Sequence, residues 1–373
     1  MSRPTRIEVD LDAVRHNVAH LGASAGAPVC AVVKADGYGH GAAAVARAAL
    51  DADAAWLAVA LVEEGAQLRA AGIDAPVLLL SEPSIADIPA LLEADLTPVV
   101  YRPAFIAALA AQVRAEGRGR LAVHVKADTG MGRVGVRPVQ WEPVLREVAG
   151  TPQLSVDGLL THLACADEVT SAGDATTREQ LAAFDRFLAT AARLGIRPRW
   201  VHAANTAGLL RHPGSRRGLV RPGIGVYGLS PDVEVVAADH GLRPALRLVS
   251  AVSYAKQLPA GTPVSYGHRW RAPSDGWVAT VPVGYADGVP RALTNRGQAL
   301  LRGVRRPVAG TVTMDQLLLW CGDEEPHVGE QVVLLGVQGG EQVRVEEWAV
   351  HADTITYEIV TQLTSRLPRH HLG

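Results

Sequence analysis

The sequence is poor in cysteine, in long apolar runs and in net charge. Its three cysteines, Cys30, Cys165 and Cys321, lie far apart in 373 residues, so we expect no disulfide framework and a reducing, cytoplasmic environment. No apolar run is long enough to span a bilayer, and no apolar signal segment follows the polar start. The chain has 36 Lys and Arg against 38 Asp and Glu. It therefore lacks the excess of positive charge that would attract nucleic acid or an acidic membrane. Small polar substrates fit better.

Up to residue 232, apolar β-branched runs alternate with amphipathic segments rich in alanine and leucine. This rhythm is typical of parallel strands joined by crossover helices, and eight such units predict an α/β fold with a closed (β/α)₈ TIM-like barrel. An open doubly wound sheet would alternate in the same way but rarely needs eight units. Residues 1–9 are free to pair elsewhere, with the second domain. The predicted strands are 28–34, 54–60, 76–81, 96–101, 121–128, 156–163, 197–203 and 219–226.

Residues 233–373 show a different sequence pattern, in which strand-like runs follow one another without helical segments between them. We expect a mostly β C-terminal domain that ends in a helix over 345–351 and a further segment over 355–363. The histidine pair His370 and His371 is interpreted as part of a solvated tail rather than as metal ligands. The predicted strands of this domain are 246–256, 277–282, 307–313, 316–320 and 331–335.

Lys34 ends the first predicted strand and is followed by a turn punctuated by glycine. An ammonium group held against apolar walls loses hydration and its pKa falls, so that the neutral amine can form a Schiff base with a carbonyl compound. Gly37 and Gly39 would let the backbone approach such a ligand, with the Tyr38 hydroxyl nearby. A lone lysine at a strand end more often points to water, so other residues must support this interpretation.

The carboxyl ends of barrel strands form the rim where ligands bind, and the predicted rim is unusually polar. Taken alone, Arg133 fits a surface guanidinium and His162 a hydrogen-bonded core histidine. Their placement on one rim with a candidate reactive lysine favours a binding site. The polar residues of this rim are Lys34, Tyr38, Lys126, Asp128, Arg133, His162, Asn205, Thr206 and Arg221.

Residues 223–228 match the dinucleotide motif G-x-G-x-x-G, but no helix is expected to open from these glycines as that motif requires. Loops after strands seven and eight of a barrel often present backbone N–H groups to a phosphate. A phosphate site together with a reactive lysine suggests pyridoxal 5′-phosphate. Close packing of the glycines at the domain junction is the structural alternative.

These motifs together resemble the alanine racemase family, whose members are pyridoxal-phosphate enzymes with a barrel and a C-terminal β domain. The resemblance runs nearly end to end. The motifs that carry it are Ala31-Val-Val-Lys-Ala-Asp-Gly-Tyr-Gly-His-Gly41, Lys126-Ala-Asp-Thr-Gly-Met-Gly-Arg133, Thr161-His-Leu-Ala164, Arg221-Pro-Gly-Ile-Gly-Val-Tyr-Gly228, Val264-Ser-Tyr-Gly267, Val283-Gly-Tyr-Ala-Asp-Gly288, Met314-Asp315 and Tyr357-Glu358.

The resemblance implies an isomerase that interconverts L-alanine and D-alanine with two bases, supplying D-alanine for peptidoglycan. Lys34 would bind the cofactor and act as one base. Tyr266 of the partner subunit would act on the opposite face, so a homodimer with composite active sites is implied. A phenol with a pKa of about 10 needs nearby positive charge or hydrogen bonds to act as a base at neutral pH. His162 and Arg221, the latter on the pyridine nitrogen, would provide this link.

The remaining roles implied by the resemblance fall into three groups, and no metal is expected. The lysine at the position of Lys126 is carbamylated in many members and braces Arg133; an unmodified ion-pair partner of Asp128 is the alternative. Phosphate binding is implied for Tyr38, Thr206, Gly223, Ile224 and Tyr357, substrate binding for Arg133, Tyr285 and Met314, and support for Lys126, Asn205 and Asp315.

Two positions depart from the family pattern. Members often carry arginine where Thr311 stands and cysteine where Thr313 stands, so the entrance to the site is the least secure part of the resemblance. A racemase of broader amino-acid preference is therefore an alternative. A non-enzymatic pyridoxal-phosphate barrel protein and a basic-amino-acid decarboxylase are further alternatives. The carrier would not need a second domain with Tyr266, and the decarboxylase lacks its expected cysteine motif here.

Overall fold

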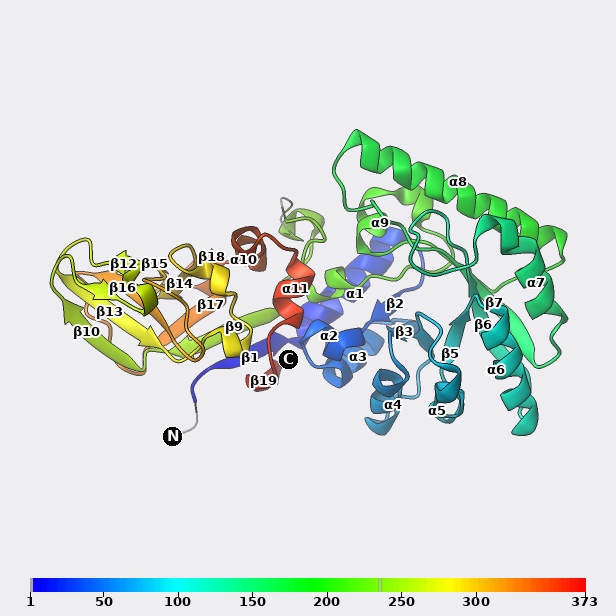
Figure 1. Cartoon of the computed structure of the whole chain (residues 1–373), viewed down its shortest axis with the longest axis horizontal. Helices are drawn as coiled ribbons and strands as arrows, with labels where there is room; N and C mark the ends of the chain where they lie inside the picture. The colour runs from blue at the N-terminus through cyan, green and yellow to red at the C-terminus, as the bar shows by residue number, and fades with distance from the viewer. Residues whose placement is uncertain (1–2, 234, 236) are drawn as a thin grey trace. The chain divides into compact units, whose positions relative to one another are not determined.

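The computed structural model describes residues 3–233, 235 and 237–373 (Figure 1). The chain divides into two compact units. The barrel unit holds residues 14–37 and 42–226, and the second unit holds the chain up to residue 13, residues 38–41 and the chain from residue 227 onward. None of the helices in the described part of the chain has the length and apolar character that crossing a membrane requires.

The barrel unit is built on seven parallel strands, each paired with its neighbours in chain order. The strand residues are apolar and mostly buried, as expected when helices cover a parallel sheet. This arrangement confirms the predicted barrel fold class up to the last strand position. The strands are β2 (Cys30–Val32), β3 (Trp56–Val59), β4 (Val77–Leu79), β5 (Thr97–Val100), β6 (Leu121–Lys126), β7 (Leu154–Leu160) and β8 (Trp200–His202).

The prediction of an eighth strand over 219–226 is wrong. That segment makes a single parallel bridge, between Val220 and Val29, before it enters the short helical turn η4 (Ile224–Tyr227). Pro222 has no N–H to donate to a ladder, so only its carbonyl oxygen pairs, accepting from Val32 N at 3.1 Å. The segment still occupies the eighth position of the barrel, because the bridge joins it to the start of β2.

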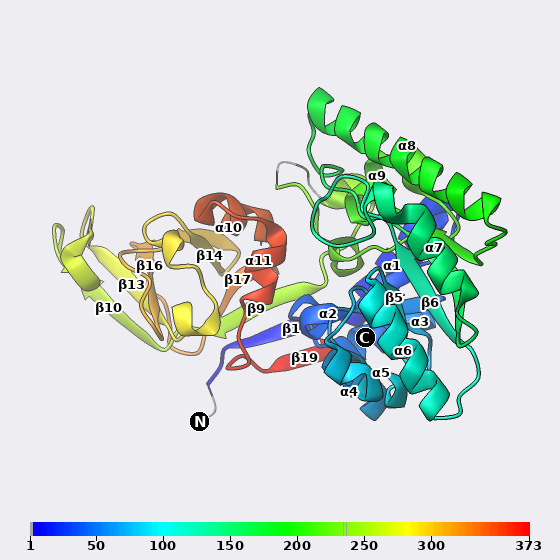
Figure 2. The ribbon, with the colours of Figure 1, turned by 45° about the vertical axis from the view of Figure 1, so that its right-hand side comes forward.

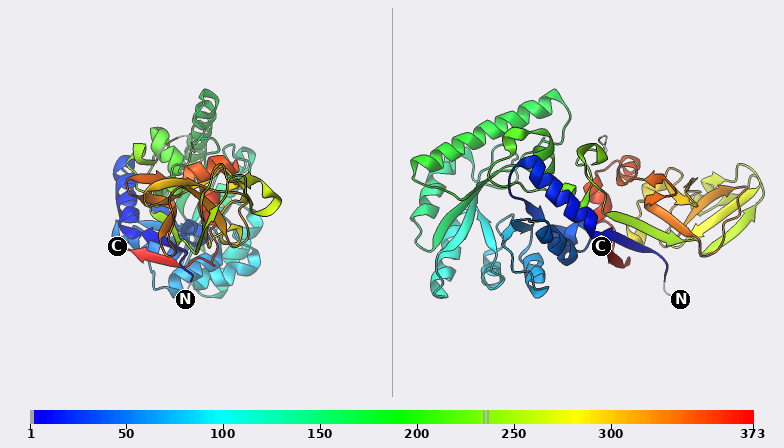
Figure 3. Two further views of the ribbon diagram at one scale, coloured as in Figure 1. Left: turned by 90° about the vertical axis from the view of Figure 1, so that its left-hand side faces the viewer. Right: turned by 180° about the vertical axis from the view of Figure 1, so that it is seen from behind.

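Helices cover the outside of the strands, and α4, α5 and α6 lie side by side in Figure 2. The longest helix, α8, is the green helix at the edge of the unit in Figure 3. It begins at Ser171, because Thr170 caps its N-terminus by accepting a hydrogen bond from Gly173 N. The helices are α1 (Leu11–Ala25), α3 (Ala42–Asp51), α4 (Val62–Ala70), α5 (Ile88–Glu93), α6 (Pro103–Ala115), α7 (Trp141–Gly150), α8 (Ser171–Arg193) and α9 (Thr206–Arg211).

The second unit contains two main sheets. One has the order β15-β14-β17-β9-β1-β19 with β18 paired to β17, and the other has the order β10-β13-β16. The N-terminal strand β1 (Arg6–Asp10) is antiparallel to β9 (Leu246–Ala251) and parallel to β19 (Arg369–Leu372). The other elements are β10 (Tyr254–Leu258), β13 (Gly276–Val281), β14 (Gln298–Leu301), β15 (Val304–Pro307), β16 (Leu317–Gly322), β17 (Gln331–Gln338), β18 (Glu341–Val343), α10 (Val345–Ala352) and α11 (Thr356–Thr361).

Two strand predictions for this unit are wrong. The run predicted as one strand over 246–256 forms two strands, β9 and β10, which belong to different sheets. No strand forms over the predicted range 307–313. The observed strand β15 ends at Pro307, and the chain then turns through Gly310, whose φ of 84° is incompatible with a strand. The tail around His370 is exposed, as predicted, but it also forms strand β19. His371 Nε2 lies 2.9 Å from the carbonyl oxygen of His40, so the end of the chain is held in place.

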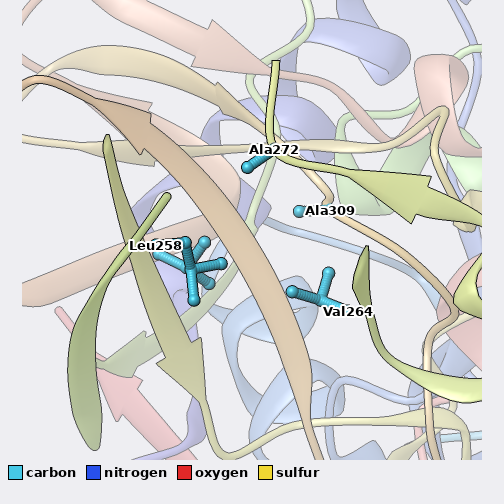
Figure 4. Close-up of a cluster of buried hydrophobic side chains, with 5 residues drawn as sticks. Leu258, Val264, Ala272 and Ala309 are labelled. Atoms are coloured by element: carbon cyan, nitrogen blue, oxygen red, sulfur yellow. The ribbon is translucent and has the colours of Figure 1, made fainter. Parts of the chain in front are cut away.

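A small buried cluster lies beneath the hairpin of β11 (Pro263–Val264) and β12 (Trp270–Arg271). Figure 4 shows Leu258, Val264, Ala272 and Ala309 of this cluster, and Val278 completes it. The Trp270 and Trp320 rings pack against it with their centroids 5.3 Å apart. Burial of these side chains fixes the base of the hairpin whose connecting turn carries Tyr266.

Candidate active site

Lys34 begins an unusual turn rather than ending a strand. Strand β2 stops at Val32, and α2 (Lys34–Tyr38) then winds with left-handed backbone angles, with φ of 52° at Ala35, 50° at Asp36 and 61° at Gly37. Each non-glycine residue in this conformation costs about 1–2 kcal/mol. Such strain persists where surrounding contacts impose it and is concentrated at functional sites.

The Lys34 amine lies among cationic groups in the barrel unit. Burial is the main reason why the pKa of Lys34 is lowered, and the nearby positive charge of Arg133 lowers it further. The carboxylate of Glu64 acts in the opposite direction. The neutral amine is therefore more accessible than in an ordinary lysine, as a carbonyl-binding nucleophile requires.

Lys126, the last residue of β6, is a second amine of the barrel unit and is buried. Burial lowers its pKa to about 8, and Arg221 and Arg133 contribute to the same shift. Asp128 does not pair with it: Asp128 Oδ1 accepts from Gly130 N at 3.0 Å and from Gly132 N at 3.1 Å, and no ion pair joins the two side chains. The charge of Asp128 still raises the pKa of Lys126, but the two side chains do not form the direct ion pair of the alternative.

Arg221 is buried at the eighth barrel position. Its Nη2 donates to the carbonyl oxygens of Thr161 at 2.8 Å and Ala203 at 3.2 Å, and its Nη1 lies 2.9 Å from His202 Nδ1. Burial lowers the pKa of Arg221 to about 10, so the group stays protonated at neutral pH. Its Nε–H makes no hydrogen bond within the described chain and remains available to a ligand.

Two buried histidines continue this network into the barrel. Because arginine only donates, His202 accepts at Nδ1, carries its proton on Nε2 and donates to His124 Nδ1 at 2.9 Å. His124 Nε2 in turn lies 4.0 Å from Asp157 Oδ2. His162 lies on the other side, with its Nδ1 3.5 Å from Arg221 Nη2, at the outer limit of a hydrogen bond. The same reasoning leaves the His162 proton on Nε2.

Burial, followed by the charge of Arg221, lowers the pKa of all three histidines: to about 3 for His124 and well below the ordinary 6.5 for His162 and His202. The folded protein therefore binds fewer protons than the unfolded chain below pH 6.5. Stability from these groups is present above that pH and is lost as pH falls toward the folded values.

We expect the free energy of unfolding to fall as pH decreases from 6.5, by at most about 1.4 kcal/mol per pH unit for each histidine. Urea unfolding between pH 7.5 and 4.5 measures this slope. A His124→Asn variant should have a shallower slope, whereas His327→Asn, at an exposed site, should not. Equal slopes for wild type and His124→Asn would contradict the assignment of a neutral His124.

Thr206 organises the candidate phosphate loop. Its Oγ1 accepts from Gly223 N at 3.0 Å and from Gly225 N at 3.2 Å, which leaves its own proton free to be donated. Gly223 N–H therefore already has a partner, whereas Ile224 N–H has none within the described residues. Asn205 caps α9, because its Oδ1 accepts from Gly208 N at 2.8 Å.

Three tyrosines cluster in the second unit. The buried Tyr38 ring lies 4.9 Å from the Tyr227 ring and 6.0 Å from the Tyr357 ring, measured between centroids. Tyr357 belongs to α11, which approaches so closely that a Cβ on Gly39 would lie 2.4 Å from the Val360 carbonyl oxygen. The glycine after Tyr38 is therefore needed for this contact, and the structure brings together the two tyrosines implied for phosphate binding.

Tyr266 protrudes from the hairpin turn and its side chain is 74% exposed. Two reciprocal hydrogen bonds hold this turn: Ser265 Oγ donates to the Thr311 carbonyl oxygen at 2.7 Å, and Thr311 Oγ1 donates to the Tyr266 carbonyl oxygen at 2.9 Å. Ser265 itself has a φ of 61°. A pocket of about 420 Å³ lies beside Tyr266, lined by residues 265–268, Thr311, Thr313 and residues 316–318.

Tyr285 is attached to the same loop. Its N–H donates to the Thr313 carbonyl oxygen at 3.0 Å. A Cβ on the preceding Gly284 would lie 2.2 Å from that oxygen, so only glycine permits the approach. Met314 is half-exposed, and Asp315 Oδ1 accepts from Arg366 Nη2 at 2.7 Å. One loop therefore orders Tyr266, Tyr285 and Met314.

Sequence reasoning missed several groups that hold the predicted residues. Gln180 is buried in α8 and donates to the His162 carbonyl oxygen at 3.3 Å, and its Oε1 accepts from Ala164 N at 2.8 Å. His202 ends strand β8 on the rim, which was a usable signal. His124 had no signal, because its partners lie in other βα units, and the same holds for the contact of Glu64 with Ala35.

The chain was compared with known proteins. Sequence models of the alanine racemase N-terminal and C-terminal domains match residues 9–231 and 245–371. Alanine racemase of Symbiobacterium thermophilum is 48% identical, with 100% of this chain and 98% of that protein covered. The crystal structure of alanine racemase from D-cycloserine producing Streptomyces lavendulae superposes with a TM-score of 0.94 at 40% identity, covering 100% of this chain and 98% of that one. Alanine racemase from Bacillus anthracis with bound L-Ala-P gives a TM-score of 0.89 at 37% identity, with coverages of 100% and 96%. With both domains matched and the identity this high over the full length, the chain belongs to the alanine racemase family.

Proposed function

We propose that this protein is a pyridoxal-phosphate-dependent alanine racemase that interconverts L-alanine and D-alanine. The observation that carries the proposal is the cationic rim of the barrel unit. Lys126 and Arg221 are buried there and Lys34 is half-buried, all three with lowered pKa values, and Arg133 adds its charge. Such a rim suits a substrate carboxylate and a cofactor phosphate. A supply of D-alanine for peptidoglycan, from the cytoplasm, is the physiological role that we propose.

The residues present fit pyridoxal 5′-phosphate. The Lys34 amine can bind its carbonyl group, the Thr206 hydroxyl and Ile224 N–H are free to donate to the phosphate, and Arg221 Nε–H is free to donate to the ring nitrogen. We assign Tyr38, Tyr357, Asn205 and Gly223 to the same cofactor site, the first two as phosphate ligands and the last as a backbone contact. When bound, the cofactor supplies an electron sink for the charge left by the departing α-proton.

Proton transfer is assigned to two bases. The Lys34 amine would exchange the α-proton on one face of the substrate, and the hydroxyl of Tyr266 of the partner subunit would exchange it on the other. Opposite faces are required because a proton removed from one side must be replaced on the other. The exposure of Tyr266 in a single chain supports its insertion into a partner, and hence a homodimer with composite sites.

The other residues would set the charge and position of these groups. His162, with its proton on Nε2, and Arg221 would stabilise the anionic form of the phenol. Arg221 cannot donate its proton fully to the ring nitrogen, because even its lowered pKa is about 10. Arg133 would bind the substrate carboxylate. Tyr285 and Met314 would line the substrate site, with Lys126 and Asp315 as supports.

A broader-specificity racemase is the second candidate. Its support is the pocket beside Tyr266, where the short side chains of Thr311 and Thr313 stand in place of the arginine and cysteine common in the family. Comparing turnover of alanine, serine and larger amino acids separates the two candidates. If alanine is not the best substrate, the narrower assignment is wrong.

The direct test uses L-alanine in deuterated water. The purified protein should abolish optical rotation and place solvent deuterium on the α-carbon. Cofactor binding without deuterium exchange on any amino acid would favour the non-enzymatic carrier and refute the proposed function.

The hydroxyl of Thr311 should matter for turnover, because it holds the Tyr266 carbonyl oxygen. A Thr311→Val variant keeps the side-chain shape but loses this bond, which is worth about 1 kcal/mol. We expect kcat to fall about fivefold. Thr311→Ser keeps the hydroxyl and is the matched control. An unchanged kcat in Thr311→Val would show that the hairpin turn holds Tyr266 without this bond.

A further inference from the structure

Glu64 links two neighbouring turns of the barrel rim. It is the third residue of α4 and is half-buried. Its Oε2 accepts from Ala60 N at 2.8 Å and from Leu61 N at 3.1 Å, in the turn that follows β3. Its Oε1 accepts from Ala35 N at 2.6 Å, in the turn that follows β2. One carboxylate therefore ties its own βα unit to the residue directly after Lys34.

The contact with Ala35 is made where the backbone most needs support. Ala35 and Asp36 both adopt left-handed angles that residues with a Cβ avoid. Two further bonds support the turn within its own unit: Ala42 N donates to Asp36 Oδ1 at 2.9 Å, and Gly37 N donates to the Val33 carbonyl oxygen at 2.9 Å. Neither of these bonds involves the first left-handed residue. The bond to Glu64 therefore fixes the peptide through which Lys34 enters the turn.

We propose that Glu64 is the positioning residue of Lys34: its carboxylate holds the left-handed turn in place and sets where the amine lies. The proposal rests on the proposed function only in assuming that the Lys34 amine binds the cofactor and acts as a base. Glu64 does not touch substrate or cofactor in this scheme. It acts through the backbone of Ala35, and through its charge on the neighbouring ammonium group.

The negative charge of Glu64 raises the pKa of Lys34. Burial and Arg133 both favour the neutral amine of Lys34, and Glu64 is the one acid that opposes them in that balance. A base that returns a proton to its substrate must be protonated for part of each turnover. Removal of the carboxylate should lower the pKa of Lys34 further, and should also release the turn.

The test compares Glu64→Gln with Glu63→Gln, which removes the same charge from the adjacent, exposed residue. Trace acylation of the full-length chain across pH, before and after cofactor loading, reports the titration of each amine by mass spectrometry. The chain has only three lysines, so Lys256 serves as the internal reference, and Lys126, whose pKa the charge of Lys34 also lowers, is followed separately. In the unloaded protein, Glu64→Gln should shift the Lys34 titration to lower pH and raise its labelling at neutral pH. Glu63→Gln should leave it unchanged.

Measurements of kcat separate the effect of Glu64 on the position of Lys34 from the effect of its charge. A misplaced reacting group can cost about 100-fold, so we expect Glu64→Gln to lower kcat by about 10- to 100-fold. Glu64→Asp keeps the charge but is one methylene too short to reach both turns. It should therefore lower kcat with little change in the Lys34 titration, and it also serves if Glu64→Gln fails to fold.

Two results would overturn the proposal. One is a Lys34 titration and a kcat that both match wild type in Glu64→Gln. The other is a loss of thermal stability in Glu64→Gln and Glu64→Asp with the Lys34 titration and kcat unchanged, which would make Glu64 a structural residue only. If no variant, nor the wild type, racemises an amino acid while the Lys34 titration still shifts, the positioning role stands and the proposed function fails.

Discussion

Tyr266→Phe should lower racemisation by about 10²–10⁴-fold in both directions, because it removes the hydroxyl that exchanges the proton on one face of the substrate. The ring remains, so the hairpin turn with its Thr311 bonds should be unchanged. Initial rates from L-alanine and from D-alanine give the two losses. Cofactor content, measured by absorbance, should equal that of wild type, since Tyr266 is not assigned to the cofactor.

Tyr254→Phe is the matched control, because Tyr254 lies on β10 of the same unit and is 59% exposed. It should keep full activity. A rate of Tyr266→Phe within a few-fold of wild type would remove Tyr266 from the list of bases and make its exposure a matter of packing between subunits.

Lys34→Ala should abolish covalent attachment of the cofactor and lower turnover by at least about 10²–10⁴-fold, since both the nucleophilic amine and one base are lost. Borohydride treatment followed by peptide mass spectrometry should find the cofactor on Lys34 in wild type and on no lysine in the variant. Lys256→Ala, at a half-buried site on β10, is the control and should behave as wild type. Attachment at Lys126 instead would refute the assignment.

The two variants also test the composite site. If Tyr266 acts in the site of the partner subunit, mixed dimers of Lys34→Ala and Tyr266→Phe chains contain one site with both bases. Subunit exchange should then restore part of the activity. No recovery despite proven exchange would mean that both bases come from one chain.

The alternation of apolar runs was sufficient to predict the barrel, because parallel strands buried on both faces impose long apolar stretches that helices separate. The same reasoning failed at the eighth position. Residues 219–226 look like a strand in apolar character, but Pro222 stops the ladder after one bridge. In the second unit, the predicted strand over 307–313 failed for the related reason that Gly310 turns the chain.

The sequence by itself determined the family and the candidate chemistry, since Lys34, Arg221 and Tyr266 lie in motifs whose residues are contiguous in the chain. Only the tertiary structure decided how those groups are held and charged. The left-handed turn after Lys34, the contact of Glu64 with Ala35 and the neutral His202 beside Arg221 depend on atoms from separate βα units. Burial and neighbouring charge fix protonation, and both are properties of the folded chain that no local pattern of residues reports.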